Sequence, residues 1–276
     1  LKILLQMSAI IQFTTKKKVI NIGRIAGQYF KPRTKSHETR GGTTLPIYRG
    51  DGVNSIKFNK QSRLPNPSRL ITAYHQSAST MNVIRALIMQ GFTDINQIKV
   101  WEKFFLDNAE LEKKYNNVVE KIRTILKFAE SSGILHPSFK NFYTSHEAIL
   151  LDYENAFIFQ EKNKNNYCCS SHMLWIGDRT RDIQSAHIQF ASLISNPIGI
   201  KIGPQVNIND LNYLCEKINP LNQDGKLIFI VRLGLKDIES ILPKIIKTVK
   251  YYGKNIVWFC DPMHGNTIRA KNGYKT

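Results

Sequence analysis

Charged and imidazole side chains follow four apolar runs in the second half of the sequence. The runs end near positions 177, 200, 231 and 260. After them come Asp178 with Arg179, then Lys201, then Arg232, and finally the carboxylate of Asp261 with the imidazole of His264. Guanidinium and ammonium groups bind carboxylates and phosphates, whereas imidazole and carboxylate groups bind divalent metals. This set suits a small anionic, phosphorylated substrate with a metal ion nearby.

The spacing of the runs predicts the elements that would bring these side chains together. The runs are rich in β-branched and aromatic residues, as buried strands are, and the intervals between them leave room for one helix each. A strand–helix–strand unit with a right-handed crossover makes its strands parallel. We expect helices near 180–195, 207–218 and 235–252, and a (β/α)8 barrel whose strands open on one shared face. Each residue alone could be an ordinary polar strand end, but four repeats in succession favour a shared site.

A second group of basic residues lies near the start of the chain. The apolar run 19–23 ends at Arg24, and a glycine-containing turn then carries Lys31, Arg33 and Thr34. A basic turn after a strand suits a phosphate or a carboxylate, but a solvated loop would have the same residues. From the residues alone, both interpretations stay open.

Helical periodicity dominates the region between these two groups. Apolar residues predict one helix over 68–89, capped by Ser68, and further helix over 94–131. This is more helix than one crossover needs. We therefore interpret residues 68–131 as an insertion that covers the barrel or makes a subunit contact.

A short strand is expected at 141–143, with the next helix beginning at Thr144. Thr144 and Glu147 have the spacing of a capping box, in which two side chains satisfy free N–H groups at a helix start. A catalytic role for His146 and Glu147 is the alternative, but capping accounts for Glu147 without it.

The composition limits the class of protein. The chain has 276 residues, 42% of them hydrophobic, which is enough for one large domain with a core. The formal net charge of +18 would suit a nucleic-acid partner, but the basic residues are spread along the chain and no stacking motif accompanies them. We expect no nucleic-acid partner.

The cysteines and the apolar runs bear on where the protein works. Four cysteines without CxxC spacing indicate a reduced, cytoplasmic protein. We interpret the opening segment 3–13 as an amphipathic helix, because its basic residues follow the apolar part and no small-residue cleavage site appears. We expect no membrane association, since no run reaches membrane-spanning length.

The motifs, taken side by side, resemble those of the type II (plant-like) 3-deoxy-D-arabino-heptulosonate 7-phosphate (DAHP) synthases. The matching segments are GRIAGQYFKPR at 23–33, YRGD at 48–51, TSHEA at 144–148, HMLWIG at 172–177, NPIG at 196–199 and DPMHGNT at 261–267. The resemblance extends over essentially the whole chain.

The resemblance implies a transferase of the shikimate pathway to chorismate and the aromatic amino acids. Such an enzyme condenses phosphoenolpyruvate with erythrose 4-phosphate in a (β/α)8 barrel. It uses a divalent metal, for which Mn²⁺ is our first expectation and Co²⁺ or Zn²⁺ are the alternatives. We expect a homo-oligomer, and a plastid location only if a transit peptide precedes the chain.

The resemblance also assigns roles to individual residues. Phosphoenolpyruvate would be held by Arg24, Lys31, Asp178, Arg179, Lys201 and Arg232. The sugar phosphate would lie towards Lys31, Arg33 and Thr34. The catalytic set would be Lys201, Asp178 and His264, with His264 as a metal ligand.

The sequence departs from the family pattern in several places. Asp178 stands where Glu is usual, which sets the carboxylate back by one methylene, and Thr34 stands where Ser is usual. None of the four cysteines lies in the family's first-strand motif, which supplies a metal ligand, and its Glu and Asp ligands would follow the last residue. By this comparison the chain carries barrel strands two to seven and lacks strands one and eight. We therefore expect residues 1–276 alone to be inactive.

Two other interpretations belong to different classes of protein. A catalytically inactive barrel remnant would act as a regulatory or assembly partner through residues 68–131. A basic nucleic-acid binder would show salt-dependent binding.

Overall fold

The computed structural model describes residues 1–90, 108–133, 142–162 and 165–271. The fold is mixed α/β and divides into two compact units. Unit 1 comprises residues 1–26 and 75–144, and unit 2 comprises residues 27–74 and 145–276.

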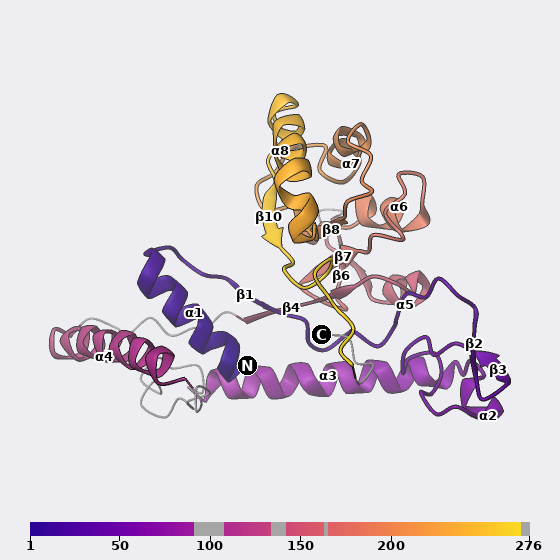
Figure 1. The fold of residues 1–276 in the computed structure, drawn as a ribbon, viewed down its shortest axis with the longest axis horizontal. Helices are drawn as coiled ribbons and strands as arrows, with labels where there is room; N and C mark the ends of the chain where they lie inside the picture. The colour runs from indigo at the N-terminus through magenta and orange to yellow at the C-terminus, as the bar shows by residue number, and fades with distance from the viewer. Residues whose placement is uncertain (91–107, 134–141, 163–164, 272–276) are drawn as a thin grey trace. The chain divides into compact units, whose positions relative to one another are not determined.

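Six parallel strands form the main sheet, in the order β1-β4-β7-β8-β9-β10 (Figure 1). Their bounds are β1 Asn21–Gly23, β4 Phe142–Glu147, β7 Met173–Ile176, β8 Ile198–Ile202, β9 Leu227–Val231 and β10 Val257–Cys260. In unit 1, β1 pairs with the first half of β4; in unit 2, the second half of β4 pairs with β7. The parallel strands confirm the expected strand–helix units and are consistent with part of a (β/α)8 barrel.

One helix follows each of β7, β8 and β9 in unit 2, as expected. These helices are α6 (Ala186–Leu193), α7 (Asp210–Ile218) and α8 (Leu235–Tyr251). The start of α6 is fixed by Ser185, whose Oγ accepts the N–H of Ile188 at 3.2 Å, as helix N-caps do.

The core of unit 2 lies between these helices and the sheet. Every residue of β9 is buried, which explains its unbroken apolar sequence, because parallel strands are covered on both faces. The side chains of Ile176, Ile200 and Phe229 are fully excluded from solvent. Each such burial contributes roughly 1.5–3 kcal/mol, so the apolar runs stabilise the strands whose ends carry the charged residues.

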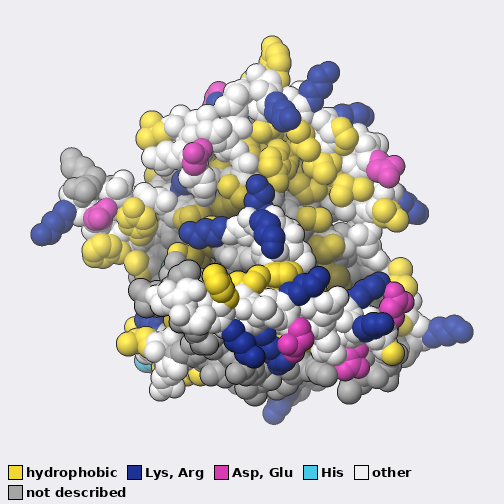
Figure 2. Space-filling view, turned by 90° about the vertical axis from the view of Figure 1, so that its left-hand side faces the viewer, with side chains coloured by type: hydrophobic (Ala, Val, Ile, Leu, Met, Phe, Trp, Pro, Cys, Tyr) yellow, Lys and Arg dark blue, Asp and Glu magenta, His cyan; other side chains and the backbone are white. Residues whose placement is uncertain are grey.

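At the end of the sheet, β10 pairs with β9 and has no second neighbour among the described strands. Its Val257 and Trp258 are 37% and 38% exposed. Ile246 and Val249 of α8 line a groove together with Val257 and Trp258. Figure 2 shows hydrophobic side chains gathered on this face of unit 2.

The predicted helices near the start and middle of the chain are confirmed where they are described. Helix α1 (Lys2–Thr15) buries Leu5 and Ala9, and α4 (Ala109–Ser131) contributes Val119 and Ile122 to a small apolar cluster. Helix α3 (Ser68–Met89) runs from unit 2 into unit 1. The part of the predicted helix at 94–107 lies outside the described residues.

Two predictions about helix starts are wrong. Thr144, His146 and Glu147 do not begin a helix; they belong to β4, where Thr144 pairs with Gly23 and Glu147 with Trp175. Pairing with strands on both sides therefore overrides the local capping signal. Ser68 is the first residue of α3 rather than its cap, and its N–H donates to Asn66 Oδ1 at 3.0 Å.

Unit 2 also contains two small antiparallel pairs and two short helices. They are β2 (His37–Arg40) with β3 (Thr43–Pro46), β5 (Ile158–Gln160) with β6 (Asn166–Cys168), α2 (Lys60–Arg63) and α5 (Leu151–Asn155). Across the described ranges, no helix combines the length and apolar character that a membrane crossing requires.

Candidate active site

Asp178 follows β7 and joins two arginines. Its Oδ2 accepts a hydrogen bond from Arg232 Nη1 at 2.8 Å, and its Oδ1 accepts one from Arg181 Nε at 3.0 Å. Gly203 leaves room for this carboxylate, because a Cβ at that position would lie 2.8 Å from Asp178 Oδ2. One carboxylate thus faces two guanidinium groups, which leaves net positive charge for an anion.

A second carboxylate, Asp261, directly follows β10 and joins a lysine to an imidazole. Its Oδ2 lies 2.7 Å from Lys201 Nζ and 2.7 Å from His264 Nδ1. Burial alone would raise the pKa of Asp261. The hydrogen bonds from Lys201 and from the backbone N–H of His264 outweigh burial and hold that pKa well below its ordinary value. Asp261 is therefore ionised at neutral pH.

Both pairs join residues whose strands are not neighbours. Asp178 and Arg232 follow β7 and β9, and Lys201 and Asp261 belong to β8 and the end of β10. In a (β/α)8 barrel, each layer of interior side chains comes from alternate strands. The two pairs match that pattern: they bring Asp178 to Arg232, and Lys201 to His264 by way of Asp261.

Lys201 itself is placed slightly differently from the prediction. It lies within β8, which extends to Ile202, rather than after the strand. Its ammonium group lies 5.8 Å from the centre of the Trp175 ring on β7, within the range of a cation–π contact.

His264 is the expected metal ligand, and its surroundings fit that role in part. A metal-bound histidine usually hydrogen-bonds its second ring nitrogen to a carboxylate, and His264 Nδ1 has such a partner in Asp261. Within the described ranges, however, no three His, Cys, Asp or Glu side chains are grouped so that they could hold a metal. These residues therefore fit one ligand with its supporting carboxylate, not a complete metal site.

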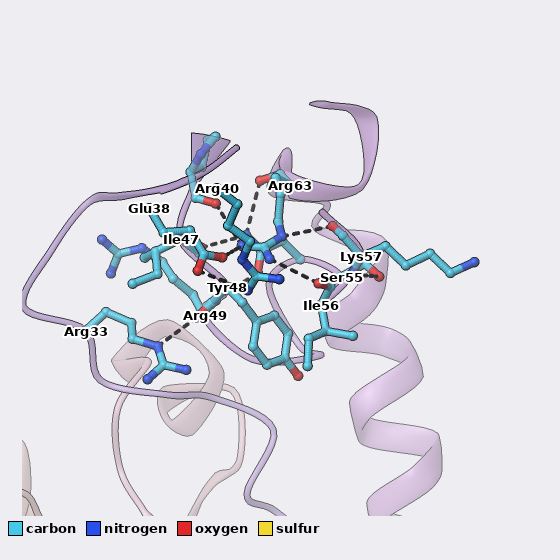
Figure 3. Close-up of polar contacts among 12 residues, drawn as sticks. Arg33, Glu38, Arg40, Ile47, Tyr48, Arg49, Ser55, Ile56, Lys57 and Arg63 are labelled. Atoms are coloured by element: carbon cyan, nitrogen blue, oxygen red, sulfur yellow. Dashed lines mark hydrogen bonds and ion pairs between the residues drawn. The ribbon is translucent and has the colours of Figure 1, made fainter. Parts of the chain in front are cut away.

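Lys31, Arg33 and Thr34 are exposed and lie close together in the sequence of unit 2. Figure 3 shows Arg33 beside Tyr48. The backbone N–H of Lys31 donates to the carbonyl of Arg49 at 2.8 Å, and Arg33 Nε donates to the carbonyl of Tyr48 at 2.9 Å. Among the residues that the structure describes, the terminal nitrogens of Arg33 make no hydrogen bond or ion pair. Within the described part of the chain, no hydrogen bond or ion pair joins this segment to Asp178 or Asp261.

The other two predicted residues are exposed. Arg24 follows β1 in unit 1 and is exposed. Arg179 is exposed beside Asp178, and it makes no hydrogen bond or ion pair with any residue that the structure describes.

The sequence prediction noted the carboxylate of Asp261 beside His264 at a strand end, but it named neither Asp261 nor Arg181 among the site residues. Asp261 directly follows an apolar run, as Asp178 and Arg232 do, so the strand-end rule itself points to it. Arg181 lies three residues after Asp178 in a turn, and no spacing rule marks it.

His146 belongs to a buried polar cluster rather than to an open site. Its Nε2 lies 2.9 Å from Glu154 Oε1, and Ser170 Oγ donates to Glu154 Oε2 at 2.6 Å. His146 and Glu154 are completely buried. Gly27 packs against the imidazole, since a Cβ there would lie 2.2 Å from His146 Nδ1. The cluster fixes the start of the 27–34 segment and does not face solvent.

Comparison with known proteins gives one consistent result. The class-II DAHP synthetase family model matches residues 1–276. Relatives named phospho-2-dehydro-3-deoxyheptonate aldolase come from Streptomyces coelicolor (43% identical over 279 residues), Neurospora crassa (38% over 296) and Mycolicibacterium smegmatis (34% over 284, AroG). Each alignment covers 100% of this chain but only 62%, 61% and 61% of the respective relative. The chain thus spans about three fifths of the length of these relatives. Because the family match includes every residue, the chain belongs to the class-II DAHP synthetase family.

Proposed function

We propose that this chain supplies the substrate-binding residues of an enzyme that condenses phosphoenolpyruvate with erythrose 4-phosphate to DAHP and phosphate. The observation that carries this proposal is the pair of carboxylate-centred groups formed across alternate strands, Asp178 with Arg232 and Lys201 with Asp261. Family membership and the names of three relatives support it.

Phosphoenolpyruvate carries a carboxylate and a phosphate, and the cations of this site keep donors for both. Arg232 uses one terminal nitrogen for Asp178, and its buried Nε has no hydrogen-bond partner among the described atoms. Lys201 has three N–H donors, and Asp261 takes one. Arg179, and by resemblance Arg24 and Lys31, would add positive charge. A clamp of this kind fixes the enol for reaction.

Carbon 3 of the bound enol would attack the aldehyde of erythrose 4-phosphate, water would add at carbon 2, and phosphate would leave. A divalent metal, when bound, supplies a Lewis acid for the aldehyde. His264 would be one of its ligands, oriented by Asp261. Asp178 would position the attacking water with a carboxylate one methylene shorter than the usual Glu. Lys31, Arg33 and Thr34 would hold the sugar phosphate.

The finer features of the fold are proposed from the resemblance. Residues 1–276 would carry strands two to seven of a (β/α)8 barrel, with residues 68–131 as a helical insertion. Two further strands between β10 and β1 would complete the barrel and bring the remaining Cys, Glu and Asp ligands for Mn²⁺. The working enzyme would be a homo-oligomer in the cytoplasm, and the four free cysteines suit such a reducing compartment.

Phosphoenolpyruvate consumption with erythrose 4-phosphate and added Mn²⁺ tests this proposal. Residues 1–276 alone should show no turnover, and a version extended at both ends with the flanking barrel strands should be active. Absence of turnover in the extended, metal-loaded protein would contradict the proposed function. Turnover by residues 1–276 alone would contradict the proposed division of the metal site.

A further inference from the structure

Arg63 is a completely buried arginine far along the chain from the predicted site residues. Its guanidinium group donates to four acceptors: the Glu38 carboxylate, and the carbonyls of Pro46 at 3.0 Å, Ile56 at 3.0 Å and Lys57 at 2.9 Å (Figure 3). These acceptors come from the β2–β3 hairpin and from the loop that precedes α2. A buried charge is costly unless it is fully paired, and here the pairing fixes the hairpin relative to that loop.

Asn54 links Arg63 to residues 47–49. It is 1% exposed, and its Nδ2 donates to the carbonyls of Arg63 at 3.1 Å and Ile47 at 3.0 Å. Its Oδ1 accepts the backbone N–H of Arg49 at 2.9 Å. These three hydrogen bonds of the Asn54 side chain hold residues 47–49 against the end of α2, where Arg63 lies.

Residues 47–52 in turn hold the segment that carries Lys31 and Arg33. The carbonyl of Arg49 accepts the Lys31 N–H, the carbonyl of Tyr48 accepts Arg33 Nε, and the N–H of Gly52 donates to the carbonyl of Tyr29 at 3.0 Å. Gly50 has a φ of +103°, and a Cβ there would lie 2.2 Å from the carbonyl oxygen of Tyr29. The two stretches are therefore in direct backbone contact, with no space between them.

We propose that Arg63 and Asn54 are positioning residues for the sugar-phosphate subsite, acting through residues 47–52 on Lys31 and Arg33. This inference rests on the proposed function for its ligand. The side chain of Arg33 is anchored by Nε alone, so its two terminal nitrogens form a fork that can bind a phosphate bidentately. The direction of that fork is set by the Tyr48 carbonyl, whose own position depends on Asn54 and Arg63.

Arg63→Lys in the protein that carries this chain with its flanking sequence is the decisive variant. Lysine keeps the charge beside Glu38 but lacks the planar fork that reaches carbonyls in several directions. We expect the KM for erythrose 4-phosphate to rise about tenfold, as loss of one charge-assisted contact would give, with the KM for phosphoenolpyruvate unchanged. Arg40→Lys is the matched control, because Arg40 also pairs with Glu38, at 3.1 Å, yet is exposed. Within the described part of the chain, its side chain makes no hydrogen bond with residues 47–52. It should leave both KM values unchanged.

Two further measurements separate positioning from general stability. In an Arg33→Ala background, Arg63→Lys should raise the KM for erythrose 4-phosphate by a much smaller factor than it does in the wild-type protein. The reason is that both changes act through the Arg33 side chain. Amide hydrogen exchange at Lys31 should accelerate in Arg63→Lys and not in Arg40→Lys. If Arg63→Lys does not fold, Asn54→Ala takes its place with the same expectations.

The outcomes distinguish this inference from the proposed function. If the intact protein has no synthase activity, the proposed function fails, and Lys31 exchange alone decides whether Arg63 controls that segment. A folded Arg63→Lys variant with wild-type KM values and wild-type Lys31 exchange would overturn the inference. So would equal increases in both KM values, since these would indicate a merely structural role.

Discussion

Asp178 and Arg232 are joined by a 2.8 Å ion pair although strand β8 lies between the strands that they follow. Strands two places apart in a sheet are separated by about 9.5 Å, so the pair depends on the long arginine side chain and on both residues facing the same side. Lys201 and Asp261 repeat the relationship one strand further along. In each pair, a carboxylate thus meets a cation across one intervening strand.

Removal of either cation should abolish most of the synthase activity. We expect Lys201→Ala and Arg232→Ala to lower kcat/KM by roughly 10²-fold or more, as loss of a preorganised charged donor does. Steady-state kinetics of the barrel-complete protein measure this, with circular dichroism to confirm folding. Lys236→Ala, at an exposed position on α8, is the control and should behave as wild type. Wild-type rates in either site variant would contradict the assignment.

Asp261→Asn should weaken metal binding as well as catalysis. The neutral amide loses its ionic contact with Lys201 and holds His264 less firmly, and a supporting residue of this kind is worth about 10–100-fold in metal affinity. Titration of Mn²⁺ into the barrel-complete protein measures the dissociation constant directly. Asp224→Asn, at an exposed surface position, serves as the comparison. An unchanged Mn²⁺ affinity in Asp261→Asn would show that Asp261 does not support a metal ligand.

The neighbouring cysteines Cys168 and Cys169 should differ sharply in reactivity. Burial raises the pKa of Cys168 to about 12, and it is completely excluded from solvent, whereas Cys169 is exposed. The thiolate is the reactive form, so a disulfide reagent at pH 8 should modify Cys169 quickly and Cys168 only after unfolding. Mass spectrometry of the modified peptides separates this pair from the exposed Cys260, and Cys169→Ser should remove the fast reaction at the pair. Rapid modification of Cys168 in the folded protein would contradict its burial.

Lys226 should make the stability of unit 2 depend on pH in the alkaline range. Burial lowers its pKa from 10.5 to about 8, while its ammonium donates to the carbonyls of Ile194 and Asn196 at 2.5 and 2.6 Å. Between about pH 8 and 10.5 the unfolded state binds more protons at this site, so its contribution to the free energy of unfolding should rise with pH.

Urea unfolding at a series of pH values measures the Lys226 effect. Lys226→Met should remove the contribution of this lysine to the rise in the free energy of unfolding with pH. It should also lower stability at neutral pH, because two carbonyls lose their hydrogen-bond donor. Lys236→Met, which changes an exposed lysine, should retain the wild-type pH profile. A Lys226→Met profile parallel to that of wild type would show that Lys226 does not titrate in this range.

The sequence predicts the second half of the fold well and its first half unevenly. The apolar runs that become β7, β9 and β10 end at Gly177, Arg232 and Asp261 respectively, so the sequence pattern and the structure agree there. At Thr144 the local pattern favours a helix start, and only the pairing of β4 with β1 and β7 decides for a strand. Such pairing joins residues that are distant in the sequence, so the residues around Thr144 do not by themselves predict it.

The candidate site was likewise predictable only in part from the sequence. That Asp178, Lys201 and Arg232 belong to strand ends follows from hydrophobic periodicity. Which carboxylate meets which cation depends on how strands two places apart face each other, and the sequence does not encode this in any spacing. The burial of Arg63 is still less predictable, because it lies in a polar stretch and its acceptors are mostly backbone carbonyls.

The unpaired side of β10 has a practical consequence for handling this polypeptide. Among the described strands, one edge of β10 is unpaired, and the strand carries partly exposed Val257 and Trp258. Such an edge is a template onto which another chain can add. Residues 1–276 expressed alone should therefore self-associate in a concentration-dependent way, and dilution or a covering segment should restore a dispersed species. The edge of β10 that a completed sheet would bury would therefore promote self-association of residues 1–276.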